Sequence, residues 1–187
     1  MKLLAGGGLA LACGLSAFLP LLVLSVAGVG NKIKLYAPFD FLASWPAVGI
    51  LAILVGFDIF ADKMTTFQAT NRNLSQITRP LAGGLACAAV VPSDLLFPAI
   101  SFVIGIVLAG AMHLMKSNLR PAFSQSSPTA RMFEPLISIG EDGLSAVLAV
   151  ISLLVPVIGA PLGLLVLGGG WWWQTNLRRK QRQVVQN

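Results

Sequence analysis

The sequence predicts an all-α fold, a polytopic bundle of transmembrane helices with about four to six membrane segments. The first observation is composition: 56% of the 187 residues are hydrophobic and only 11% are charged, whereas soluble domains carry about 25% charged residues. The second is that the apolar runs are long and unbroken, while the strands of a membrane barrel alternate in polarity. Since lipid cannot satisfy bare peptide groups, such runs must be helical. We expect one integral membrane domain over residues 1–187.

The charge pattern predicts how the chain is oriented in a cell inner (plasma) membrane. The net charge is +6, and the basic residues lie between and after the apolar runs, as expected of cytoplasmic segments. This distribution favours a lipid partner over nucleic acid. With a basic cytoplasmic tail at 174–187, both termini are predicted to be cytoplasmic. The cysteines, Cys13 and Cys87, lie in apolar runs without metal-ligand spacing, so we expect them to be packing residues.

The first half of the chain predicts two ordinary spans, at residues 3–30 and 45–61. Small residues recur at helical spacing along the first span, where a neighbouring helix can approach closely: Gly6, Ala10, Cys13, Gly14 and Ala17. Pro20 is expected to kink this span. The connection at 31–44 is polar and aromatic, which suits the membrane interface.

The second half predicts two broken or re-entrant helical hairpins. After a polar loop at 62–79, the apolar run 80–91 is too short to cross a bilayer, which takes about 20 residues. We expect the run 80–91 to be re-entrant, to tilt, or to form one arm of a hairpin with the full-length span 95–115. A polar segment at 116–138 follows. The last apolar block contains Pro156 and Pro161, which favour a hairpin of 144–155 and 160–173.

Three groups of ionisable residues lie near predicted span ends. Asp58 and Asp62 share a helix face beside Lys63, and a carboxylate inside a span is by default a functional residue. For Asp62 and Lys63, a solvated pair at the helix end explains the pattern equally well.

The second group is basic and the third is acidic. His113, Lys116 and Arg120 follow one stripe where the span 95–115 leaves the membrane. They suit a phosphate or carboxylate, but also a helix end whose side chains reach lipid headgroups. Glu141 and Asp142 open the last apolar block, where capping alone explains carboxylates. We predict that the three groups converge between helices as a binding site. No motif indicates a catalytic residue, a metal site or a cofactor, so we do not expect an enzyme.

At these motifs the chain resembles a family of small polytopic membrane proteins, domain-of-unknown-function family 4126. The shared strings, in order along nearly the whole chain, are GLSAFLPLL, DIFADK, TRPLAGGLACA, HLMKSNLR and SSP…ED. The family tends to have Arg where Ser16 stands, Glu where Asp58 stands, and Pro with acidic residues after ADK. Here Met64, Thr65, Gln68 and Asn71 occupy that stretch. The resemblance implies the architecture, and any polar pocket of the family would carry fewer charges in this chain.

Two functions from different classes fit this pattern. The first is a transporter of a small solute, an ion or a lipid headgroup, acting as a homo-oligomer, because ionisable pairs lie at helix ends beside broken hairpins. The alternative is a non-catalytic membrane scaffold or assembly factor. It draws on the small-residue stripe of the first span and on Gly159–Gly163, both of which are helix-packing devices. Ionisable groups that line a water-accessible cavity would favour transport, whereas groups that pair off at the surface would favour the scaffold.

Overall fold

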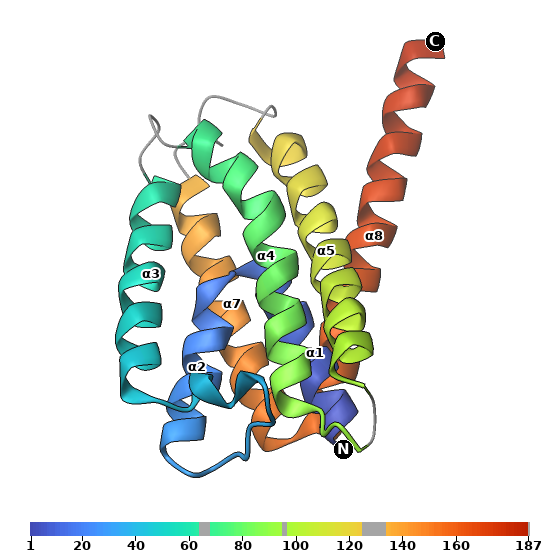
Figure 1. Ribbon diagram of the computed structural model, residues 1–187. Helices are drawn as coiled ribbons and strands as arrows, with labels where there is room; N and C mark the ends of the chain where they lie inside the picture. Colours follow the sequence, from blue (N-terminus) through green and yellow to red (C-terminus); the bar gives the residue numbers. More distant parts are fainter. Residues whose placement is uncertain (64–67, 95–96, 125–133, 187) are drawn as a thin grey trace.

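The structure is a computed structural model that describes residues 1–63, 68–94, 97–124 and 134–186. Within these residues it is all-helical. The helices, which Figure 1 shows running alternately up and down, are α1 (Lys2–Leu15), α2 (Phe18–Val29), the 3-10 turn η1 (Phe39–Leu42), α3 (Trp45–Lys63), α4 (Gln68–Val90), α5 (Pro98–Ser124), α7 (Glu134–Leu154) and α8 (Pro156–Gln186).

Burial in this bundle is the reverse of that in a soluble protein. Large apolar side chains face outward, with Ile53 74% and Leu165 72% exposed, whereas Arg79, His113 and Lys116 are buried. An apolar exterior is stable only where lipid covers it. Three helices are long and apolar enough to cross a membrane, at Pro98–Asn118, Leu136–Leu154 and Pro156–Asn176. The fold is therefore a helical membrane bundle, as the sequence predicts.

The first apolar run differs from the single span expected at 3–30. It forms the short helices α1 and α2, which meet at Ser16 and Ala17 in the middle of the bundle and run back to the same end (Figure 1). We call this pair the α1–α2 hairpin. At 1.5 Å per residue the two arms are about 21 and 18 Å long. Each is shorter than a hydrocarbon core of about 30 Å.

Pro20 explains why the helix stops at Ser16. Proline has no N–H to donate to the carbonyl four residues earlier, and its ring clashes with that carbonyl, which here belongs to Ser16. Ser16 is accordingly extended, with φ −138° and ψ 127°. The sequence predicts a kink at this proline, but the structure contains a complete reversal of the chain.

Helix α2 ends in a Schellman motif that returns the chain to the bundle end. Asn31 has a φ of 55°, a conformation that asparagine tolerates well. The Lys32 N–H donates to the Ala27 carbonyl at 3.0 Å, and the Asn31 N–H donates to the Gly28 carbonyl at 3.1 Å. These bonds satisfy the last carbonyls of the helix. The following loop is anchored on α4 by the Tyr36 N–H, which donates to the Ala89 carbonyl.

Helix α4 is a second departure from the prediction. The polar residues 68–79, expected as a loop, are the first half of a helix that passes through Pro80 and reaches Val90. It is about 34 Å long, so the run 80–91 is neither short nor re-entrant. Leu74, Ile77 and Leu81 form its exposed apolar stripe. The short helices that turn back within the bundle are instead those of the α1–α2 hairpin.

The last apolar block divides into α7 and α8, which turn at Val155, close to the predicted position. Helix α8 begins with Pro156, where the missing N–H costs nothing. The two chain termini lie at opposite ends of the bundle (Figure 1), which we call the lower end, with the N-terminus, and the upper end, with the C-terminus. The sequence predicts both termini in the cytoplasm on the reading of 3–30 as one span, and their placement relative to the membrane stays a prediction.

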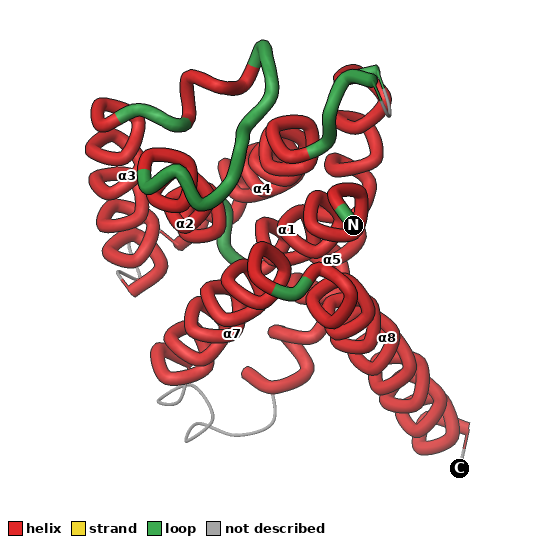
Figure 2. Tube along the Cα trace, turned by 90° about the horizontal axis from the view of Figure 1, so that it is seen from below, coloured by secondary structure: helices red, strands yellow, loops and turns green. Residues whose placement is uncertain are grey.

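Helix α1 is the central element, surrounded by α4, α5, α7 and α8 (Figure 2). Its small residues allow this, as the sequence predicts. A Cβ atom on Gly14 would lie 2.6 Å from the Ala109 carbonyl oxygen. Helices α4 and α5 are equally close, because a Cβ on Gly105 would lie 2.4 Å from the Gly83 carbonyl oxygen. Cys13 and Cys87 are buried as free thiols within this packing.

Candidate functional site: a buried polar layer above the hairpin

The site is built around Lys116 on α5. Its ammonium group donates to the carbonyl oxygen of Leu15, the last residue of α1, at 2.7 Å. It also lies 2.7 Å from Glu141 Oε2 on α7, in an ion pair whose side chains are 4% and 19% exposed. One side chain thus joins three helices. Because the C-terminal end of a helix carries partial negative charge, the cation is placed where it stabilises α1 most.

A second contact satisfies the interrupted end of α1. Ser145 on α7 donates its hydroxyl to the Ala12 carbonyl at 2.8 Å, and the Ser16 N–H donates to the same oxygen at 3.2 Å. A helix end inside a membrane leaves carbonyls that lipid cannot satisfy. Helices α5 and α7 therefore supply, from far along the chain, the donors that make the reversal at Ser16 stable.

Arg79 and His113 form the next contact on the α4 side. Arg79 lies near the middle of α4 and is 4% exposed, while His113 on α5 is 7% exposed. Arg79 Nη1 lies 3.4 Å from His113 Nδ1. A guanidinium can only donate, so Nδ1 is the acceptor and the imidazole carries its proton on Nε2.

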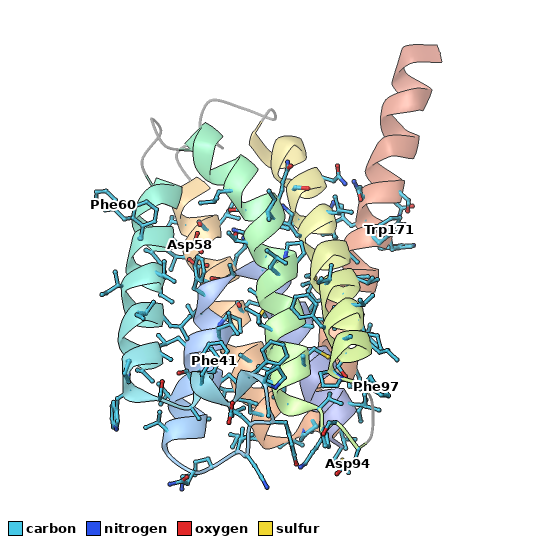
Figure 3. All side chains as sticks on the ribbon, viewed as in Figure 1. Phe41, Asp58, Phe60, Asp94, Phe97 and Trp171 are labelled. Carbon is cyan, nitrogen blue, oxygen red and sulfur yellow. The ribbon has the colours of Figure 1, made fainter. Side chains whose placement is uncertain are left out.

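These groups share one level of the bundle. From a rise of 1.5 Å per residue, they lie about 17 to 27 Å from the lower ends of their own helices, a band that includes the tip of the α1–α2 hairpin. Asp58, half-buried in the upper half of α3 (Figure 3), and Asp142 on α7 lie at the same level. We call this set the polar layer: Asp58, Arg79, His113, Lys116, Glu141 and Asp142.

The structure brings together part of the predicted site. Lys116 of the basic stripe and Glu141 of the acidic group are in contact, and His113 lies one turn below Lys116. Asp58 lies on a different helix, α3, in its upper half (Figure 3). The side chains of Asp62, Lys63 and Arg120 lie outside the described residues. Among the described residues, no cluster of three or more His, Cys, Asp or Glu side chains could hold a metal ion.

Two components of the site were missed from sequence. Arg79 was assigned to a cytoplasmic loop, although Leu74, Ile77 and Leu81 at helical spacing were a signal that α4 extends through it. The Leu15 carbonyl has no sequence signal of its own. This carbonyl accepts a hydrogen bond from Lys116 only because Pro20 ends α1 inside the bundle.

The fold and the site together define a polytopic helical membrane protein with a re-entrant hairpin and buried ionisable groups. Residues 3–175 match the family described as "Domain of unknown function (DUF4126)". The chain belongs to this family, as its motifs indicate. No curated protein and no solved structure matches it.

Proposed function

We propose that the protein moves a small polar solute or an ion across an inner membrane, through the region of the polar layer. The observation that carries this proposal is the Lys116 bridge, which joins a buried carboxylate to the end of a helix interrupted inside the bundle. Interrupted helices whose ends face polar groups near the midplane are the usual construction of solute sites in secondary transporters. Ionisable groups in such a position are costly, and function is the default explanation for them.

The scaffold alternative loses part of its support. The small residues of α1 that suggested contact with other proteins are used within the chain, since Gly6 packs on Cys87 and Gly14 on Met112. Gly159 and Gly163 likewise face Ser152 and Leu11.

The orientation that we propose follows the positive-inside rule. The basic residues in helix segments at the upper end are Lys63, Arg72, Arg120, Arg178, Arg179, Lys180 and Arg182, against Lys2, Lys32 and Lys34 at the lower end. The upper end and the C-terminus then face the cytoplasm, and the N-terminus faces the opposite side.

A C-terminal fluorescent-protein fusion should fluoresce, and an N-terminal epitope should react with antibody in intact spheroplasts. Protection of that epitope until lysis would contradict this orientation.

The transport proposal is tested in proteoliposomes with labelled rubidium, chloride and glutamate as probes. We expect flux of at least one probe above that of protein-free vesicles. The double variant Lys116→Met with Glu141→Leu, which removes both charges together, should lower that flux to the protein-free level. Ser117→Ala is the matched control, because its hydroxyl bonds only locally, to the Leu114 carbonyl. Equal flux in the double variant and the wild type would reject the assignment.

A further inference from the structure

Two lysines gather around Tyr36 at the lower end of the bundle, on the side away from the polar layer. Lys2, the first residue of α1, donates its ammonium group to the phenol oxygen of Tyr36, and its Nζ lies 4.5 Å from the ring centroid. Lys34, in the loop after α2, has its Nζ 5.9 Å from the same centroid. Two cations from separate elements therefore share one aromatic ring. We call Lys2, Lys34 and Tyr36 the Tyr36 cluster.

The backbone, and not the lysines, holds the ring in place. The Tyr36 N–H donates to the Ala89 carbonyl near the lower end of α4, at 2.9 Å, and the tyrosine is half-buried. Lys2 and Lys34 are both exposed. The cluster is thus fixed at its centre and open at its rim, where a ligand from outside the bundle can reach both ammonium groups.

The polar groups that remain in the cluster are all donors. An ammonium group has three N–H bonds and no lone pair to accept with, and Lys2 uses one of its N–H bonds on the phenol oxygen. The phenol O–H of Tyr36 has no acceptor among the residues that the structure describes. A ligand that complements the cluster must therefore offer several acceptor oxygens.

The positive charge of the cluster is not balanced by the described part of the chain. Asp40 in η1 and Asp94 at the lower end (Figure 3) form no ion pair with either lysine, and the first turn of α1 has no acidic residue. Residues 95 and 96, which lie outside the described ranges, are leucines and carry no charge. Because two like charges beside one ring repel each other, an anion bound between them removes that repulsion.

The depth of the cluster identifies where such an anion comes from. Trp45, at the start of α3, and Phe97, just before α5, are largely exposed at the lower end, and Trp171 is exposed in the upper half (Figure 3). Exposed aromatic side chains of this kind lie at the two interfaces of a membrane. The Tyr36 cluster is therefore level with the lower interface, where the phosphate groups of lipids are the abundant anions.

From these observations we propose that the Tyr36 cluster binds the phosphate group of an anionic lipid headgroup. The two ammonium groups and the phenol O–H donate to the phosphate oxygens, in hydrogen bonds that the charges strengthen. Since Lys2 begins α1 and Lys34 follows α2, the bound phosphate joins the two lower ends of the α1–α2 hairpin. The proposal does not depend on the proposed transport, because the hairpin is held in this way whether or not a solute passes the polar layer.

Tyr36 is the only tyrosine in the chain, so a single label reports on the site. Protein labelled with ¹³C at the tyrosine Cζ is dissolved in dodecyl maltoside, a detergent without phosphate or charge. It is then titrated with phosphatidylglycerol or with phosphatidylcholine of the same acyl chains. We expect a saturable change in the Cζ resonance with phosphatidylglycerol and a much weaker response to the zwitterionic lipid. No change with phosphatidylglycerol, or equal titrations with both lipids, would overturn the proposal.

Two variants with the same loss of charge separate a site from a general attraction to anionic lipid. Lys34→Gln should raise the dissociation constant for phosphatidylglycerol about fivefold, the effect of one lysine at a membrane surface. Lys32→Gln is the matched control, because Lys32 is in the same loop and exposed but does not contact the ring. It should change the constant less than twofold. Equal weakening in the two variants would show that only the total charge matters, and would overturn the site.

The source of the phosphate is tested in the same micelles with inorganic phosphate and no added lipid. We expect no saturable change in the Cζ resonance, because the free ion lacks the acyl chains that hold a headgroup at this depth. A change equal to that with phosphatidylglycerol would show that the cluster takes phosphate from water, and would overturn the assignment to lipid.

Discussion

The two halves of the bundle are held together by different forces. Below the hairpin tip, α1, α4 and α5 approach to backbone contact through Gly14, Gly83 and Gly105, with alanine and cysteine filling the remaining space. At the level of the tip, the helices are joined through the charged and polar side chains of the polar layer. Close packing has one arrangement, whereas ion pairs and hydrogen bonds can exchange partners. The lower half is therefore a close-packed frame, and the polar layer is the part of the bundle joined by directional polar contacts.

The largest effect should come from breaking the frame. Gly105→Leu places a side chain where a Cβ already lies 2.4 Å from the Gly83 carbonyl oxygen. Because the neighbour is backbone and cannot move aside, we expect a loss of about 3 kcal/mol or more in the free energy of unfolding. Steric trapping in micelles measures it. The matched control is Gly49→Leu on α3, where nothing lies within 4 Å, and which should change stability by less than about 0.5 kcal/mol. Equal losses in both would show that the close approach is not what holds α4 to α5.

An intermediate loss in the free energy of unfolding is expected when one charge is removed from the polar layer. Lys116→Met leaves the Glu141 carboxylate without its cation and the Leu15 carbonyl without its donor. We expect a loss of about 2–4 kcal/mol, somewhat below that of a fully buried pair because Glu141 is 19% exposed. Adding Glu141→Leu should recover most of it. A double variant as unstable as Lys116→Met alone would mean that the carbonyl contact, rather than the ion pair, is what the lysine supplies.

The smallest effect concerns a single hydrogen bond between helices. Ser145→Ala removes the donor to the Ala12 carbonyl, and the expected cost is about 0.5–1 kcal/mol. Ser152→Ala is the comparison, because that hydroxyl is equally buried but bonds within its own helix, to the Leu148 carbonyl at 2.7 Å. Unfolding of both variants by SDS titration gives the difference. If Ser152→Ala were the more costly change, the reversal at Ser16 would not depend on α7.

Sequence reasoning succeeded where the cause is local. Long apolar runs identify α5, α7 and α8, and the turn near Pro156 follows from proline chemistry. It failed at α4, because polar residues before Pro80 suggest a loop when nothing shows which neighbours will cover them. It also failed at the first run, where hydropathy gives the length of the apolar segment but not the direction of the chain after a break.

The candidate site shows the same division between what local sequence predicts and what neighbouring helices decide. Lys116 and Glu141 were recognisable as ionisable groups near span ends, and the structure pairs them. Arg79 was not recognisable as part of the site, because its burial depends on the packing of α5 against α4. That packing depends in turn on the close approach of Gly83 and Gly105.

By itself, the sequence determined that this chain folds as apolar helices with its charged residues confined to a few positions, because the hydropathy and length of a segment are local properties. Only the tertiary structure decided that the first run turns back at Ser16. A helix can end inside a membrane only where its last carbonyls find donors. Those donors, Ser145 and Lys116, lie more than a hundred residues away along the chain.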